Sequence, residues 1–145
     1  MDDINTTKPP TWFWVVAIIA VIWEIFGVAS YLYHVTLSPA GLAALPESQR
    51  RLMEITPTWV NGAFAIATWS GLAGAVGLVL RRRWAQPLLL VSVVAIVIQF
   101  GWVFLVGNSI ELIGPGSVAF PMFILGFGIF LWWFAGNSAR RGWLR

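Results

Sequence analysis

The sequence predicts an all-α membrane protein, a four-transmembrane-helix bundle with both termini in the cytoplasm. Apolar residues make up 59% of the 145 positions and charged residues only 10%, whereas soluble domains carry about 25% charged residues. Four apolar stretches approach the roughly 20 residues that a helix needs to cross a bilayer. They cover residues 12–34, 59–80, 86–106 and 118–136, so little is left for anything but a single transmembrane domain.

Basic residues are divided unevenly between the loops that these four helices would create. If the chain crosses the membrane four times, both terminal segments and the middle loop share one side, which holds Lys8, Arg81, Arg82, Arg83, Arg140, Arg141 and Arg145. The other side holds only Arg50 and Arg51. Positively charged loops are retained in the cytoplasm, so both termini are expected there. Because topology explains the net charge of +3, the expected partner is the lipid bilayer, and no nucleic acid is expected.

The longest predicted connection, the external loop of residues 35–56, contains the starts of two short helices. Ser38 can cap a helix beginning at Pro39, because a serine oxygen accepts a backbone hydrogen bond and proline suits the first helical position. A second helical segment is predicted from Pro46 to Ile55, where apolar and charged residues are mixed. We expect this segment either to lie along the membrane surface or to form a lid over a cavity.

The second apolar stretch carries small residues at four-residue spacing. These residues are Ala63, Ala67, Gly71 and Ala75. Small side chains at this spacing allow two helix backbones to approach closely, so a tight helix contact is predicted along this face. The partner helix belongs either to the same chain or to a second copy, and the sequence leaves that choice open.

Glu24 is a carboxylic acid near the middle of the first apolar stretch. Ionisable residues at this depth are costly and are functional-site candidates by default. Helical steps of three and four residues lead from Glu24 to Tyr31 and His34, which lie on roughly the same face. This stripe either relays a proton or holds a polar ligand, or Glu24 is neutral and hydrogen-bonded inside the bundle while Tyr31 and His34 are ordinary interface residues.

Two amides extend the set of candidate ligand-binding residues. Asn61 and Gln99 lie in the same half of the membrane as Tyr31 and are expected to meet Tyr31 or Glu24 if their faces point inward. The alternative is that these amides join the helices through hydrogen bonds, which contribute about 0.6 kcal/mol each on average. The candidate ligand-binding residues are therefore Glu24, Tyr31, His34, Asn61 and Gln99.

The chain lacks the residue sets that most cofactors and reactions need. It has no cysteine and a single histidine, so paired-histidine haem ligation and cysteine-ligated metal sites are excluded. We find no acidic metal motif, no phosphate-binding loop and no pairing of a nucleophile with a base. The sequence therefore predicts no enzyme, no catalytic residue, no metal site and no cofactor.

Two segments resemble a group of small four-span bacterial inner-membrane proteins that are uncharacterised and sometimes labelled "sugar transporter". The resemblance is carried by residues 21–32, with Trp23, Glu24 and Gly27, and by residues 57–87, with Trp59, Trp69, Gly71 and the run from Arg81 to Trp84. It implies a multi-pass protein of the bacterial inner (cytoplasmic) membrane. Similar proteins tend to have asparagine at the position of Glu24, which favours a hydrogen-bonding role there over a proton carrier.

Two functions follow as hypotheses. The first is an outward-facing polar pocket that binds or transports a small or lipophilic molecule, with a homodimer required for transport because four helices make a thin wall. The alternative is a non-catalytic accessory or scaffolding subunit of a larger membrane complex, which would use the small-residue face and aromatic faces as contacts.

Overall fold

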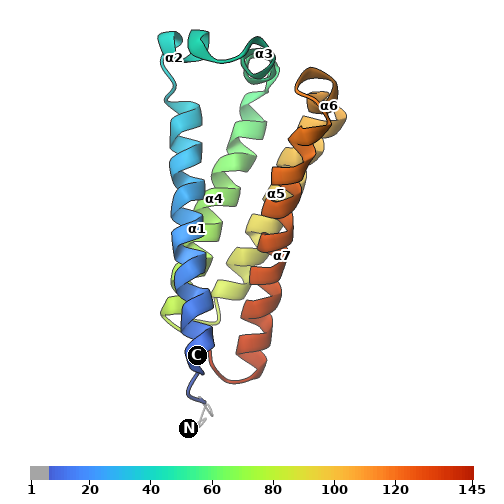
Figure 1. Ribbon diagram of the computed structural model, residues 1–145. Helices are drawn as coiled ribbons and strands as arrows, with labels where there is room; N and C mark the ends of the chain where they lie inside the picture. The colour runs from blue at the N-terminus through green and yellow to red at the C-terminus, as the bar shows by residue number, and fades with distance from the viewer. Residues whose placement is uncertain (1–6) are drawn as a thin grey trace.

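The computed structural model describes residues 7–145, which form four long helices and four short helical segments (Figure 1). The long helices are α1 (Thr11–Val35), α4 (Thr58–Val79), α5 (Ala85–Leu105) and α7 (Ala119–Arg140). The short segments are α2 (Pro39–Ala44), α3 (Glu47–Ile55), α6 (Ser109–Leu112) and the 3-10 helix η1 (Pro115–Val118). No strand occurs within residues 7–145. All four long helices are long and apolar enough to cross a membrane, which confirms the predicted number of spans.

The two ends of the bundle differ in what they carry. The start of α1, the C-terminal end of the chain and the α4–α5 loop lie at one end of the bundle, which we call the termini end (Figure 1). The helices α2, α3 and α6 lie at the other, which we call the α3 end. The seven basic residues expected on one side of the membrane are at the termini end, and Arg50 and Arg51 are on α3.

The helix α4 packs on both α1 and α5, and α5 in turn packs on α7, so that α4 and α5 are the two inner helices of the series. The small residues of α4 are buried in these contacts. A Cβ built on Gly71 would collide with the carboxyl of Glu24 on α1, and one built on Gly74 would lie 2.7 Å from Leu89 on α5. The predicted small-residue seam therefore joins helices of the same chain.

The tightest packing lies in the half of the bundle near the termini end. Phe13 of α1 and Phe134 of α7 are fully buried, and their rings stack with centroids 5.5 Å apart. Leu78, Leu89 and Leu131 complete a core to which all four long helices contribute. Contacts between α1 and α7 are made largely by aromatic side chains of this kind.

The end of the chain closes the termini end of the bundle. Trp143 and Leu144 follow α7 and are both buried, at 6% and 0% exposure. Arg81 holds them in place: its Nε donates to the Trp143 carbonyl at 2.7 Å, and its own carbonyl accepts from the Arg145 N–H at 2.6 Å. Arg81 also adopts a φ of 55°, so that the α4–α5 turn depends on a left-handed residue that is not glycine.

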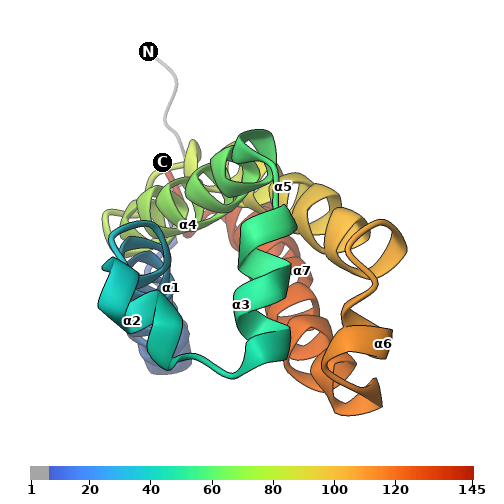
Figure 2. The ribbon, with the colours of Figure 1, turned by 90° about the horizontal axis from the view of Figure 1, so that it is seen from above.

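The short helix α3 crosses the opposite end of the bundle (Figure 2). The segment from Ser38 begins as predicted: the Ser38 Oγ accepts a hydrogen bond from the Gly41 N–H at 3.0 Å, and Pro39 is the first residue of α2. Further along, Leu52 of α3 reaches Gly107, just beyond the end of α5, where a Cβ would lie 3.0 Å from the Leu52 Cδ1. This position is compatible with both alternatives for the segment, a helix along the membrane surface and a lid.

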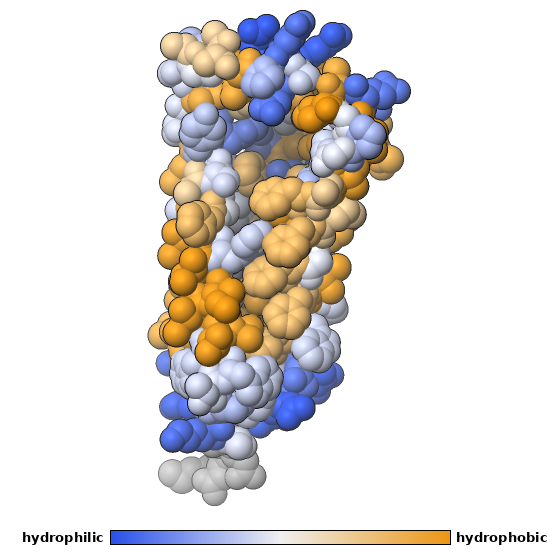
Figure 3. All heavy atoms as spheres, in the orientation of Figure 1, coloured by the Kyte–Doolittle hydropathy of each residue, from blue (hydrophilic) through white to orange (hydrophobic). Residues whose placement is uncertain are grey.

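The outer surface of the bundle is apolar between two hydrophilic ends (Figure 3). Large apolar side chains on all four long helices are half exposed or more, among them Ile18, Ile66, Val97 and Phe123. A surface of this kind is suited to contact with lipid chains. The fold is thus compatible with a small integral membrane protein.

Candidate functional site

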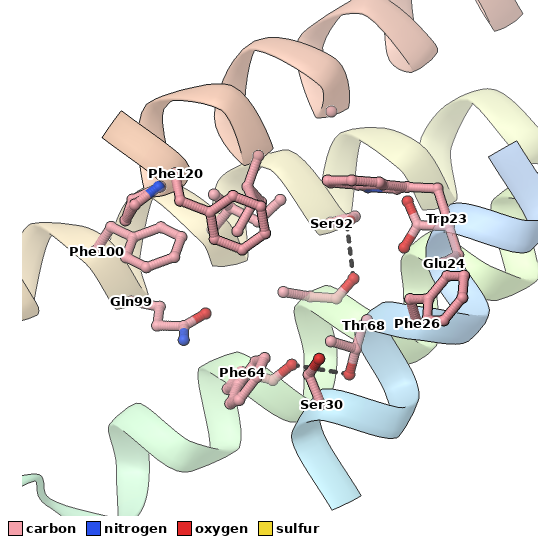
Figure 4. A pocket seen from close by; sticks show the side chains of 16 residues that line it. Trp23, Glu24, Phe26, Ser30, Phe64, Thr68, Ser92, Gln99, Phe100 and Phe120 are labelled. Atoms are coloured by element: carbon pink, nitrogen blue, oxygen red, sulfur yellow. Dashed lines mark hydrogen bonds between the residues drawn. The ribbon is translucent and has the colours of Figure 1, made fainter. Parts of the chain in front are cut away.

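A cavity of about 310 Å³ lies between the four long helices, and every one of them contributes to its lining. Its polar lining consists of Glu24, Ser30, Thr68, Ser92 and Gln99 (Figure 4). Apolar pockets with a few convergent polar groups are the usual form of small-molecule sites. This cavity, which we call the Glu24 cavity, is therefore the candidate functional site.

Two glycines make room for the carboxyl of Glu24. Gly71 on α4 lies directly against this carboxyl, and a Cβ built on Gly27 of α1 would lie 3.9 Å from the Glu24 Oε2. A larger residue at Gly71 would collide with the carboxyl, whereas a Cβ at Gly27 would make only an ordinary contact with it. Glu24 as a whole is only 8% exposed and lines the cavity. The sequence thus buries an acidic side chain by placing it beside residues that have no side chain.

The hydroxyls of Thr68 and Ser92 do not donate to Glu24. The Thr68 Oγ1 donates to the Phe64 carbonyl of its own helix at 3.0 Å, and the Ser92 Oγ donates to the Ala67 carbonyl at 2.7 Å. A hydroxyl has a single proton to donate, so both protons are already engaged. Across residues 7–145, neither a hydrogen bond nor an ion pair reaches the Glu24 carboxyl, which differs from the hydrogen-bonded state considered from the sequence.

Aromatic rings form much of the remaining wall. The rings belong to Trp23, Phe26, Phe64, Phe100 and Phe120 (Figure 4). Trp23 bridges α1 and α7, since its ring meets those of Phe123 and Phe127 edge to face at 5.4 and 5.1 Å. The cavity is therefore bounded by aromatic side chains on several sides, with the carboxyl as its one acidic group.

The cavity reaches the side of the bundle between α1 and α7. Two of its lining residues, Phe26 and Phe120, are 67% and 64% exposed. The space-filling view shows a hollow on this face, between α1 and the part of α7 below α3 (Figure 3). A molecule that enters here passes between side chains that face the apolar surroundings of the bundle.

The five predicted ligand-binding residues are divided between different places. Glu24 and Gln99 line the cavity. The His34 Nε2 and the Asn61 Oδ1 lie 3.2 Å apart and line a second pocket of about 270 Å³ under α2 and α3. Tyr31 lines neither, and its ring packs edge to face on Phe64 at 5.4 Å. Asn61 thus meets His34 rather than Glu24.

Sequence reasoning missed the aromatic wall and Ser30. Helical spacing could have identified part of it, because Trp23, Gly27 and Ser30 follow one another at steps of four and three residues beside Glu24. On α5, Gln99 shares its face with Phe100 and Ser92 in the same way. Phe64 and Phe120 carry no such signal, because their helices are apolar on every side.

Within residues 7–145, no group of three or more histidine, cysteine, aspartate or glutamate residues is placed to hold a metal ion. The chemistry available in the cavity is that of one carboxyl, hydroxyls, an amide and aromatic faces.

The chain matches no known family model, no curated protein and no solved structure. Its class therefore comes from the fold and the composition, and four apolar helices are compatible with a small integral membrane protein.

Proposed function

We propose that this protein binds a small lipophilic molecule in the Glu24 cavity. The observation that carries the proposal is a cavity of about 310 Å³, lined by all four long helices, that contains a buried carboxyl without a partner in the described chain. A volume of this size is at the lower end of the range for small-molecule pockets. The opening between α1 and α7 supports a ligand that arrives from the lipid phase.

The proposal includes a location and an orientation. The protein would lie in the bacterial inner membrane as a multi-pass protein of the four-span group that its sequence resembles, with both termini in the cytoplasm and the α3 end outward. The support is the distribution of basic residues, since the positive-inside rule favours the termini end as the cytoplasmic one. No catalytic role and no cofactor are part of the proposal.

Binding is favoured over transport by the contrast between the two ends of the bundle. A transported molecule would need a path past the termini end. There Phe13 and Phe134 are stacked, and Trp143 and Leu144 are buried beneath the α4–α5 turn. Transport would therefore require opening of this core or a homodimer with a path between two copies.

The alternative, an accessory or scaffolding subunit of a larger membrane complex, has less support from the structure than the binding proposal. It relied on the small residues of α4 as a contact surface, and these are used within the chain against α1 and α5. What remains for a partner is a set of exposed aromatic side chains, which includes Phe26 on α1, Trp59 and Trp69 on α4 and Phe123 on α7. This alternative would be favoured if the protein were purified in a stable complex with other subunits and no ligand changed its stability.

Ligand-dependent stabilisation tests the binding proposal. Three small aromatic probes that differ in charge would be added to the purified protein: 2-phenylethylamine as its ammonium form, 2-phenylethanol and phenylacetate. A ligand at about 100 times its Kd stabilises a protein by about 2.7 kcal/mol. We expect at least one probe to raise the melting temperature of the wild-type protein.

The variant Thr68→Met fills the cavity, because Thr68 lines it and its hydroxyl bonds only to its own helix. This variant should lose the probe effect. The matched control is Ile66→Met on the same helix, where the side chain is 53% exposed, and it should keep the effect. If no probe stabilises the wild-type protein, or if Thr68→Met responds as the wild type does, the proposed function is wrong.

A further inference from the structure

We propose that the ligand of the Glu24 cavity is a small organic cation, with an ammonium group beside Glu24 and an apolar body among the aromatic rings. The inference rests on the proposed function and names the chemical class of the molecule bound. It is carried by three features of the cavity: an unpartnered acid, neighbours that act as hydrogen-bond acceptors, and a wall of aromatic faces.

The first feature is the absence of a basic partner for Glu24. In the described part of the chain, lysine and arginine occur only outside the membrane-spanning core: in the segment before α1, on α3, in the α4–α5 turn and from the last residue of α7 onward. Buried charges in proteins are paired, because an isolated charge at low dielectric is very costly. A cationic ligand would supply the charge that the protein does not.

The second feature is the hydrogen-bonding character of the groups near Glu24. Thr68 and Ser92 lie around the same end of the cavity as Glu24 (Figure 4). Both hydroxyls donate hydrogen bonds to backbone carbonyls, at 3.0 and 2.7 Å. Their oxygens can therefore only accept further hydrogen bonds. An ammonium group has three donors and no acceptor, whereas a hydroxyl offers one donor. This end of the cavity therefore matches an ammonium better than an alcohol.

The third feature is the aromatic wall. Cations are attracted to the faces of tryptophan and phenylalanine rings within about 6 Å, and the attraction is stronger where water is excluded. Trp23 is the neighbour of Glu24 in the sequence, and its ring lies at the end of the cavity that holds the Glu24 carboxyl (Figure 4). Phe100 extends the aromatic wall beside Gln99 at the other end. A neutral ligand would gain contact area from these rings but no electrostatic attraction.

The rest of the cavity sets the size of the ligand and excludes other ions. Gln99 lies two helical turns from Ser92 on α5, about 10 Å along the helix axis, which leaves room for an apolar body of that length.

A calcium ion needs six to eight oxygen ligands, whereas Glu24 is the only carboxylate in the lining. An anion would meet the carboxylate without any basic residue to balance it.

The probes 2-phenylethylamine and 2-phenylethanol test this inference, because they share one carbon framework and differ in the ammonium and hydroxyl groups. Their affinities would be measured by calorimetry on the detergent-purified full chain at neutral pH. We expect the ammonium form to bind roughly tenfold more tightly, as hydrogen bonds between charged groups are the stronger ones. In Glu24→Gln, which keeps the shape of the side chain, this preference should disappear while 2-phenylethanol still binds.

A second pair of variants covers the case in which Glu24→Gln does not fold. Trp23→Leu removes the ring that lies at the same end of the cavity as Glu24 and should weaken binding of the ammonium form about threefold more than binding of the alcohol. Trp69→Leu is the matched control, because Trp69 on α4 is 50% exposed and does not line the cavity. This control should leave the preference unchanged.

The outcomes separate the two proposals. Equal or tighter binding of 2-phenylethanol, or an ammonium preference that survives Glu24→Gln or Trp23→Leu, would overturn the cation inference and leave the binding function in place. Tighter binding of phenylacetate would overturn it as well. Failure of all three probes to bind would overturn both proposals.

Discussion

The half of the bundle near the termini end and the half below α3 are built from the same four helices, yet only one of them is filled. Near the termini end, Phe13, Leu78 and Phe134 are fully buried. Below α3, about 310 Å³ remains open beside Glu24. Apolar helices by themselves therefore do not produce a closed bundle.

The difference comes from how large and small side chains meet. Near the termini end, Gly74 and Gly77 of α4 receive Leu89 and the ring of Trp84, so each gap is filled by a neighbour. At the level of the cavity, the Glu24 carboxyl lies against Gly71. Size complementarity closes one half, whereas in the other half the side chain that meets the glycine is an acid that also lines the open space. The candidate site lies where packing is incomplete.

We call the half near the termini end the packed half and the half below α3 the open half. The largest expected effect on stability is in the packed half. Phe134→Ala removes a fully buried ring that stacks on Phe13 and meets Trp12 edge to face at 5.8 Å. We expect a loss of about 3 kcal/mol in unfolding free energy, the low end for such truncations, because lipid also solvates the ring in the unfolded state. Equilibrium unfolding in mixed micelles with increasing SDS would measure it.

The control for this prediction is Phe120→Ala in the open half, where the ring is 64% exposed. Its truncation should cost less than about 1 kcal/mol. Equal losses for Phe120→Ala and Phe134→Ala would remove the distinction between the two halves.

A smaller effect is expected from adding a single methyl group. In Gly74→Ala the new Cβ would lie 2.7 Å from the Leu89 Cγ and 3.3 Å from the Ala85 carbonyl oxygen. The backbone atom cannot move aside, so we expect destabilisation of about 1 to 3 kcal/mol in the same unfolding assay.

Gly101→Ala is the counterpart in the open half, because a Cβ there meets no atom within 4 Å. It should be neutral or should stabilise by up to about 1 kcal/mol, as alanine is the better helix former. The prediction fails if both glycine variants shift stability in the same direction and by the same amount.

The smallest effect is expected at the α3 end. His34 and Asn61 share one hydrogen bond of 3.2 Å in a partly exposed position. A double-mutant cycle with His34→Ala and Asn61→Ala should give a coupling of about 0.6 kcal/mol, typical of hydrogen bonds between membrane helices. A coupling above about 2 kcal/mol would show that this end is held as firmly as the packed half.

Much of the fold could be predicted because it follows from local properties of the chain. Apolar length predicts four spans, and the Ser38–Pro39 pair predicts the start of α2. The candidate site was harder, because it depends on which faces meet. Glu24 and Gln99 line one cavity, whereas His34 and Asn61 pair elsewhere. Helical spacing alone does not distinguish these arrangements.

The sequence by itself determined that the chain forms four apolar helices and that one carboxyl lies at mid-span, because hydropathy and helical rise depend only on the order of residues. The tertiary structure decided that the small residues of α4 face helices of the same chain. It also decided that the hydroxyls of Thr68 and Ser92 are engaged by carbonyls instead of Glu24. The physical reason is that helices apolar on every side have no distinct inward face, so only the packing of side chains selects one.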